Sequence, residues 1–244
     1  MHVNIKFKVK NDCVSLPISY NHLVQSCIYN SISDELADFL HSTGYCVEKR
    51  NFKLFSFSRL NGPFQIDKDK KEICFFEKIG LTVSSLVDEF CESLVNTLLT
   101  KGEVRIGSNV LEVESINAKK IKIDQPEIKV KTLSPIVVYS TLLGPDGRKY
   151  TCYFQPGDPD FESLIDNNLK KKYYALHSEQ FSQGSIKLRS LGRCKLNIIN
   201  YKNFVIKGYS GRLALSGPKD LLQIAVDGAL GSKNSQGFGC IDLL

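Results

Sequence analysis

The chain has 244 residues and a formal charge of +6 at neutral pH, from 32 basic and 26 acidic side chains. Hydrophobic residues make up 42% of it, enough for a packed core and too many for a disordered chain. Its apolar runs stop far short of the roughly 18 residues that a membrane span needs, so we exclude a membrane protein and expect a cytoplasmic one. The length suits one large domain or two small ones.

The first part of the chain alternates predicted strands and helices. Period-two alternation or apolar, turn-bounded runs predict strands at 3–9, 53–60 and 73–79. Between the first two strands, an apolar stripe over 23–28 predicts one helix, and a second helix starts near Ser33 and stops at Gly44. Apolar residues from Val83 to Leu98 then keep the i, i+3, i+4, i+7 spacing of one helix face, and Gly102 follows them. We therefore expect a helix over the whole of 83–98.

The second part repeats this order. Strands are predicted at 110–116, 128–139, 184–200, 204–216 and at the C-terminal end, with a turn at 144–147, a helix over 161–169 and another that Pro218 starts. Both halves thus show strand, helix, strand, strand, helix, strand, which is typical of the ferredoxin-like fold. We expect an α+β protein of two tandem ferredoxin-like (RRM-like) domains, residues 1–125 and 126–244, with a central cleft between them.

The eight cysteines are too widely spaced for a shared metal site. They stand at least fourteen positions apart, at Cys13, Cys27, Cys46, Cys74, Cys91, Cys152, Cys194 and Cys240. A C-x-x-C pair, which would deliver two thiolates to one ion, does not occur. We therefore expect no metal, no cofactor and no disulfide framework.

The positive charge is concentrated in one segment. Residues 168–212 carry ten basic side chains and one acidic one, a net +9, while the rest of the chain sums to −3. Six tyrosines and phenylalanines are interleaved with these charges, a mixture suited to phosphate contacts and base stacking. The alternative is an ordinary solvated basic face. Because the segment has so few acidic residues of its own, we favour nucleic-acid binding.

A glycine-rich run covers residues 228–239. Four glycines with Lys, Asn and two Ser between them would let backbone N–H groups approach a phosphate without a Cβ in the way. The spacing matches neither nucleotide-cofactor motif, and residues 237–241 match the RNP1 core of RNA-recognition motifs only in part. The alternative is a plain turn before an edge strand.

Tyr29, His41 and Lys53 form a second candidate group. Tyr29 lies about 150° from the middle of the apolar stripe of its helix, at 100° per residue, and so falls on the polar face. His41 stands at the end of the next helix, where a histidine is commonly a surface residue matched to the helix dipole. Periodicity alone does not bring the three together.

The chain resembles a family at these residues. The matching blocks are Leu16–His22 leading into 28–30, Leu40–His41 followed by 52–58, residues 231–239 and, more weakly, 133–136. They resemble the CRISPR-associated endoribonucleases of Cas family six, in the repeat-associated RAMP superfamily, in that family's order. The resemblance implies two ferredoxin-like domains in tandem. It also places the family's catalytic tyrosine, histidine and lysine on Tyr29, His41 and Lys53.

One position departs from the family pattern. The C-terminal loop of the family opens G-x-G, and Ala229 stands at the first of those glycines, with Gly228 displaced by one residue. If that glycine needs a positive φ, the loop backbone must differ here.

The resemblance implies metal-independent cleavage of precursor CRISPR RNA within its repeats. A 2′-hydroxyl attacks the adjacent phosphate and leaves a 2′,3′-cyclic phosphate and a 5′-hydroxyl. His41 would transfer protons, most simply as the base, Lys53 would stabilise the phosphorane charge, and Tyr29 would position the phosphate or exchange a proton. The two proton roles can be reversed. A non-catalytic RNA-binding RAMP subunit is the alternative, and a structural scaffold of a larger ribonucleoprotein a more distant one.

The expected partner is CRISPR repeat RNA, bound as a hairpin or as a single strand. The resemblance also admits other Cas proteins and a second copy of the chain as partners. The basic segment and the glycine-rich run supply the expected RNA-binding residues: Lys170, Lys171, Lys172, Lys187, Arg189, Arg193, Lys195, Gly231, Lys233, Asn234, Ser235, Gly237 and Gly239.

Overall fold

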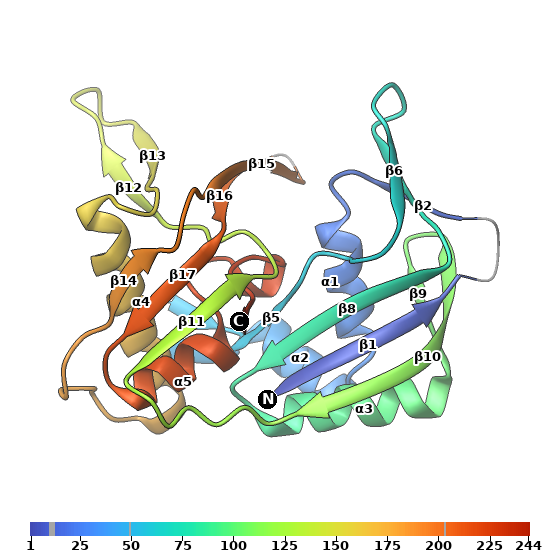
Figure 1. The fold of residues 1–244 in the computed structure, drawn as a ribbon, viewed down its shortest axis with the longest axis horizontal. Helices are drawn as coiled ribbons and strands as arrows, with labels where there is room; N and C mark the ends of the chain where they lie inside the picture. The colour runs from blue at the N-terminus through green and yellow to red at the C-terminus, as the bar shows by residue number, and fades with distance from the viewer. Residues whose placement is uncertain (10–12, 49, 203) are drawn as a thin grey trace.

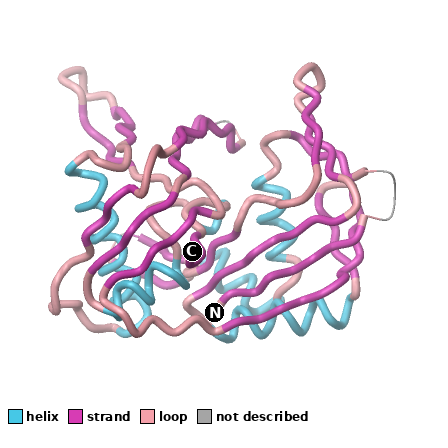
Figure 2. Tube along the Cα trace, viewed as in Figure 1, coloured by secondary structure: helices cyan, strands magenta, loops and turns pink. Residues whose placement is uncertain are grey.

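Two antiparallel sheets, each covered by helices on one face, form the fold (Figures 1 and 2). The computed structural model describes residues 1–9, 13–48, 50–202 and 204–244. A five-stranded sheet has the order β5-β8-β1-β10-β9, and a four-stranded sheet has the order β14-β17-β11-β18. In the view of Figure 1 the two sheets lie side by side in front of the helices, and both chain ends lie near the middle. The fold is the expected pair of ferredoxin-like units.

The N-terminal unit is built around β1 (His2–Lys8), which pairs with β8 (Lys78–Ser85) on one side and β10 (Asn109–Lys119) on the other. The alternation in β1 buries one set of side chains against the helices and leaves its lysines outside. The sheet is completed by β5 (Phe55–Phe57) and β9 (Glu103–Ile106). Two smaller sheets join β2 (Val14–Pro17), β6 (Phe64–Asp67) and β7 (Glu72–Phe75), and β3 (Tyr45–Val47) and β4 (Arg50–Phe52).

Three helices belong to this unit: α1 (Asn21–Tyr29), α2 (Asp34–Ser42) and α3 (Asp88–Lys101). The Ser33 hydroxyl caps α2, and Gly102, at φ 66°, ends α3, as predicted. The predicted start of α3 at Val83 is wrong. Val83 pairs with Val3 inside the sheet, and its burial follows the alternation of β8, which happened to match a helical spacing.

The C-terminal unit places α4 (Pro159–His177) and α5 (Lys219–Gly228) against one face of its sheet. Its strands are β11 (Glu127–Thr132), β14 (Lys187–Ser190), β17 (Arg212–Ser216) and β18 (Ile241–Leu243). Two hairpins leave this sheet: β12 (Tyr139–Leu143) with β13 (Lys149–Tyr153), and β15 (Lys195–Tyr201) with β16 (Phe204–Ser210). Since β10 ends at Lys119 and β11 begins at Glu127, the connection between the units spans the domain boundary predicted at residue 125.

Several predicted strands are divided in the structure. The predicted strands 184–200 and 204–216 each consist of two strands in the structure. Bends near Gly192 (φ 106°) and Gly211 separate β14 and β17 from the β15–β16 ribbon. The predicted strand 73–79 splits at Glu77, whose φ is 60°, into β7 and β8. The strand expected over 128–139 ends at Thr132. At each of these points the chain passes from one sheet to another. A local apolar pattern does not predict which sheet a segment joins.

Each unit has its own hydrophobic core, and a third cluster joins the ribbon to the C-terminal loop through Val137, Ile199, Tyr201, Ile206 and Phe238. Among the described residues, no helix has the length and apolar character needed to cross a membrane. The same residues contain no group of three His, Cys, Asp or Glu side chains arranged for a metal ion.

A substitution in the N-terminal core tests the packing of α3 on the sheet. Phe90, on α3, is 2% exposed and its ring stacks on Phe55 of β5 at 4.7 Å between centroids. Phe90→Ala is expected to lower the free energy of unfolding by about 3–5 kcal/mol, because it leaves a cavity between helix and sheet. Leu99→Ala on the same helix, at a side chain 66% exposed, is the control and is expected to change it by less than about 0.5 kcal/mol. Equal effects in urea denaturation would contradict this packing.

Candidate functional site

The structure brings Tyr29, His41 and Lys53 together. All three line one pocket of about 1240 Å³ between the N-terminal helices and the C-terminal loop. Tyr29 is the last residue of α1, His41 lies in the last turn of α2, and Lys53 directly follows β4. Ser235 and Gln236 of the glycine-rich run border the same pocket. The pocket therefore has one wall from each half of the chain.

Tyr29 is half-buried and oriented by an aromatic contact. Its ring meets Phe55 edge to face, with 5.8 Å between centroids and 72° between planes. Burial, with a smaller contribution from the nearby Tyr201, raises the pKa of the Tyr29 phenol. The hydroxyl is thus held in its protonated form, which can donate a hydrogen bond or a proton.

The side chain of Lys53 lies close to the C-terminal end of α2. Its Nζ donates to the backbone oxygen of His41 at 3.5 Å, and desolvation lowers the pKa of its ammonium. Gly44, at φ 62°, makes this approach possible, since a Cβ there would lie 3.1 Å from Lys53 Nζ and 2.6 Å from a backbone oxygen. The glycine predicted as a helix stop therefore also gives the lysine its path into the pocket.

Two further cations line this pocket, Lys101 and Lys202. Lys101 Nζ donates to the Asn30 carbonyl at 2.9 Å, just beyond the end of α1. The spacing of Lys101 from the buried Leu94 and Leu98 is a signal that sequence reasoning missed, because it puts the lysine at the end of the buried stripe of α3. Lys202 lies in the turn of the β15–β16 ribbon, whose position over α1 had no local signal.

The ribbon is tied to α1 by side chains. Tyr201 of β15 donates a hydrogen bond to Gln25 Oε1, and its ring meets His22 edge to face at 6.5 Å. His22 and Gln25 line the pocket as well. The C-terminal unit therefore reaches across to the helix that carries Tyr29.

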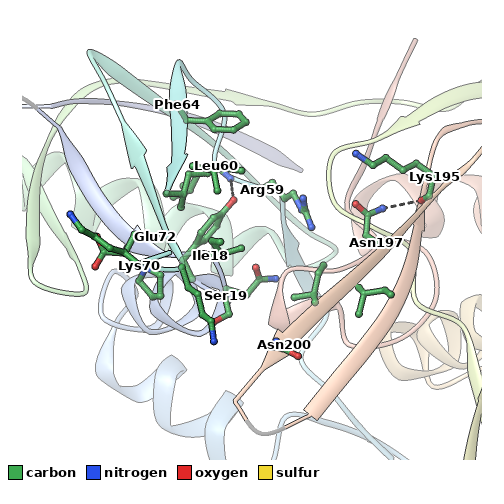
Figure 3. Close-up of a pocket in the computed structure, with 18 of the residues that line it drawn as sticks. Ile18, Ser19, Arg59, Leu60, Phe64, Lys70, Glu72, Lys195, Asn197 and Asn200 are labelled. Carbon is green, nitrogen blue, oxygen red and sulfur yellow. Dashed lines mark hydrogen bonds between the residues drawn. The ribbon is translucent and has the colours of Figure 1, made fainter. Parts of the chain in front are cut away.

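A second cleft, of about 790 Å³, lies between β15 and the β2 and β6 strands (Figure 3). In Figure 3, Phe64 and Ile18 lie on the N-terminal side, Lys195 and Asn200 on the opposite side, and Arg59 between them. The lining combines exposed apolar side chains with basic ones: Ile18, Phe64, Ile66, Leu196 and Ile198 with Arg59, Lys70, Lys71 and Lys195. Such a lining suits unpaired bases and their phosphates.

Some basic side chains of the segment 168–212 are already paired with carboxylates. Lys170 pairs with Asp166 at 2.8 Å and Lys171 with Glu48 at 2.6 Å, so carboxylates from outside the segment offset two of its charges. A count of acidic residues within the segment therefore overstates the free positive charge at these positions. The exposed basic side chains of the predicted RNA surface are Lys187, Arg189, Arg193 and Lys195, on β14, β15 and the turn between them.

Lys172 does not fit the predicted RNA surface. Its side chain is buried, with the residue 1% exposed, and its Nζ donates to the carbonyls of Gly228 and Ala229, both at 2.8 Å. Burial lowers the pKa of this ammonium to about 7. The prediction that Lys172 contacts RNA is wrong because the residue lies under the end of α5.

The glycines of the loop give it shape. Gly231, Gly237 and Gly239 have φ of 70°, 83° and 75° and are buried. A Cβ on Gly239 would lie 1.9 Å from the Leu230 oxygen, and one on Gly237 would lie 2.4 Å from the Phe57 ring. The N–H groups of Gly237 and Gly239 already donate to the oxygens of Asn234 and Pro135. The predicted use of these two N–H groups for phosphate is therefore wrong.

The crest of the loop, residues 232–236, carries its half-exposed polar side chains. Lys233 lies over the Tyr139 ring at 5.5 Å, and burial lowers the pKa of its ammonium. Asn234 Nδ2 donates to the Leu230 and Phe238 oxygens and closes the loop on itself. Lys233 and Ser235 thus remain the better placed of the predicted loop contacts.

Ala229 has a backbone that usually requires glycine. Its φ is 67° and its ψ is 165°, and the side chain is fully buried. The alanine therefore has not removed the positive φ, contrary to the expected change of backbone. A non-glycine residue in this region carries a strain of about 1–3 kcal/mol, which persists only where the surroundings hold it.

The fold defines a class: proteins with two ferredoxin-like domains in tandem. A solved structure titled "An RAMP protein binding different RNA substrates" superposes with a TM-score of 0.83 at 22% identity, covering 100% of this chain and 99% of that one. Family models match nearly the whole chain, the Cas6 N-terminal model at residues 15–117 and the Cas6 C-terminal model at 116–243. The chain belongs to the Cas6 family of CRISPR-associated endoribonucleases.

Two curated relatives carry that name. "CRISPR-associated endoribonuclease Cas6 1" of Methanocaldococcus jannaschii is 27% identical, over 99% of this chain and 92% of its own length. "CRISPR-associated endoribonuclease Cas6" of Pyrococcus furiosus is 28% identical, over 95% of this chain and 85% of its own.

The shape of the loop can be tested at a glycine. Gly239→Ala is expected to lower the free energy of unfolding by about 2–5 kcal/mol, because the new Cβ overlaps the Leu230 oxygen and the residue has a positive φ. Gly147→Ala is the matched control, with φ 73° and no atom within 4 Å of the added Cβ, and should lose only about 1–2 kcal/mol. Chemical denaturation compares the two, and a Gly239 variant as stable as the control would refute the packing of the loop.

Proposed function

We propose that this protein is a metal-independent endoribonuclease that cleaves precursor CRISPR RNA within its repeats. The 2′-hydroxyl of the RNA attacks the adjacent phosphate, and the products carry a 2′,3′-cyclic phosphate and a 5′-hydroxyl. The observation that supports this most directly is the gathering of Tyr29, His41 and Lys53 in one pocket next to the C-terminal loop. The names of the relatives support the same substrate.

RNA brings its own nucleophile, so the protein needs to supply three things. A base must take the 2′-hydroxyl proton, a cation must offset the charge that builds on the phosphate, and an acid must protonate the leaving 5′-oxygen. His41 is exposed to the pocket and imidazole exchanges protons near neutral pH, so we assign it the base role. Tyr29, kept protonated by burial, is the acid, and Lys53 the cation.

The RNA chain would approach along the cleft of Figure 3. Its phosphates would contact Lys195 and Arg59, and unpaired bases would lie against the exposed apolar side chains of both walls. Ser235 of the loop crest, which lines the pocket, would hold the strand where it enters, with Lys233 two residues before it on the same crest. Because the transcript is made inside the cell, this activity requires the protein in the cytoplasm. Other Cas proteins and a second copy of the chain are further candidate partners.

A non-catalytic RNA-binding subunit is the second candidate. It is favoured by the lining of the cleft, which does not include His41, so that the cleft can hold RNA without it. Incubation of the purified protein with its own repeat RNA in EDTA distinguishes the two: the enzyme yields cut RNA, and the subunit only a complex.

His41 provides the decisive variant. His41→Ala is expected to lower the single-turnover cleavage rate by at least about 10²-fold, because it removes the proton-transfer group, while the Kd for repeat RNA changes little. His177→Ala is the control, since His177 also stands in the last turn of a helix and lies outside the pocket. A rate unchanged in the His41 variant would reject the assignment.

The substrate supplies a second, independent check on the chemistry. A repeat RNA with a 2′-deoxy sugar at the cut site should bind and stay intact, because it lacks the nucleophile. Cleavage of that RNA, or cleavage that stops in EDTA, would reject metal-independent attack by the 2′-hydroxyl.

The cleft predicts how binding depends on salt. Removing Lys195 from the phosphate path should weaken RNA binding and reduce the slope of log K against log[salt] by about 0.7. Lys149→Ala is the control, because this exposed lysine lies on the β12–β13 hairpin, which Figure 1 shows projecting from the C-terminal unit. The slopes are measured by fluorescence anisotropy. Identical slopes for Lys195→Ala and the wild type would show that Lys195 does not contact the RNA phosphates.

A further inference from the structure

Lys172 is a buried cation that the proposed reaction does not use. It lies on α4 and points under the C-terminal end of α5, where its Nζ donates to two successive carbonyls. The last carbonyls of a helix have no partner within the helix, so an ammonium at that end satisfies them and offsets the negative end of the helix dipole. Lys172 is in this sense a cap supplied by a neighbouring helix.

The two carbonyl oxygens that accept from Lys172 belong to the peptides on either side of the Ala229 Cα. The Gly228 oxygen belongs to the peptide before the Ala229 Cα, and the Ala229 oxygen belongs to the peptide after it. The rotation of the first peptide about that Cα is φ, and the rotation of the second is ψ. A single Nζ at 2.8 Å from both oxygens therefore restrains both dihedral angles of Ala229 together.

That restraint acts where the backbone is strained. Ala229 has φ 67° and ψ 165°, a combination that a side chain strongly disfavours. Without an anchor, the alanine would relax to negative φ and the chain would leave α5 in another direction. The two hydrogen bonds of Lys172 are well placed to prevent this.

The direction of the chain at Ala229 decides where the loop goes. Leu230 N–H donates to the Gly239 oxygen and Ser232 N–H to the Val137 oxygen, which closes the loop immediately after the strained residue. At the far side of the loop, Asn21 Nδ2 of α1 donates to the Gln236 and Gly237 oxygens. Ser235 and Gln236 then border the pocket.

We propose that Lys172 is a positioning residue, which sets the C-terminal loop against the pocket by fixing the peptides on both sides of Ala229. The proposal rests on the proposed function for its consequence in RNA cleavage, but the anchoring itself does not. A lysine that merely stabilised the fold would affect the folded fraction and leave the rate of the folded enzyme unchanged.

The test combines Lys172→Met, Ala229→Gly and the double variant. Methionine keeps the length and apolar volume of the side chain and removes its donors, and glycine accepts a positive φ without strain. In Lys172→Met, assayed well below its melting temperature, the single-turnover cleavage rate at saturating repeat RNA should fall at least tenfold. Adding Ala229→Gly should recover the rate to within about threefold of the wild type.

Lys219→Met is the matched control. It removes an exposed lysine at the opposite end of α5 and should leave the rate unchanged. A folded Lys172→Met that cleaves at the wild-type rate would overturn the proposal. So would a slow Lys172→Met that Ala229→Gly does not improve.

Hydrogen exchange tests the anchor without RNA. The Leu230 and Ser232 amides should exchange at least tenfold faster in Lys172→Met than in the wild type. In Ala229→Gly they should exchange within twofold of the wild type, because Lys172 still restrains the more flexible residue. A tenfold increase in Ala229→Gly would overturn the proposal even where Lys172→Met does not fold. If the wild type does not cleave repeat RNA, the proposed function fails, and exchange still decides the role of Lys172.

Discussion

The docking of the C-terminal loop on α1 is the contact on which the pocket depends. Asn21 donates to the Gln236 and Gly237 oxygens at 2.9 and 3.3 Å, and Gly237 lies so close to Phe57 that no side chain fits between them. Tyr29, His41 and Lys53 come from the N-terminal unit, and the opposite wall comes from this loop. Neither unit alone therefore encloses the pocket, although each has its own core.

The β15–β16 ribbon contributes to both cavities, since Lys202 lines the pocket and residues 195–200 line the basic cleft. Its inner face, with Ile199, Tyr201 and Ile206, is buried beside Phe238 of the loop, and its outer side chains Leu196 and Ile198 line the basic cleft. A two-stranded ribbon has little stability of its own, so this inner face holds it in place. The ribbon that lines the cleft and the loop that borders the pocket therefore share one buried cluster.

Local pattern predicted the elements of this fold well and their ends less well. The stripe over 23–28 and the signals at Ser33, Gly44 and Gly102 correspond to α1, α2 and the end of α3, because caps and amphipathic faces are set by neighbouring residues. The spacing around Val83 predicts a helix wrongly, because strand alternation and helix spacing coincide over a few residues. The long strands near the basic segment were not divided, because pairing with distant strands decides where each one ends.

The candidate site was likewise only partly predictable from local sequence pattern. The convergence of Tyr29, His41 and Lys53 needed a family resemblance, since they stand on separate elements. Counting charge misled at Lys170, Lys171 and Lys172, because a count ignores which side of a helix each residue occupies. On α4 the buried residues Phe161, Ile165, Leu169 and Lys172 follow the i, i+4, i+8, i+11 spacing of one face. Position on that stripe, rather than residue type, distinguishes the buried Lys172, which donates to the end of α5, from the two half-buried lysines beside it, which pair with carboxylates.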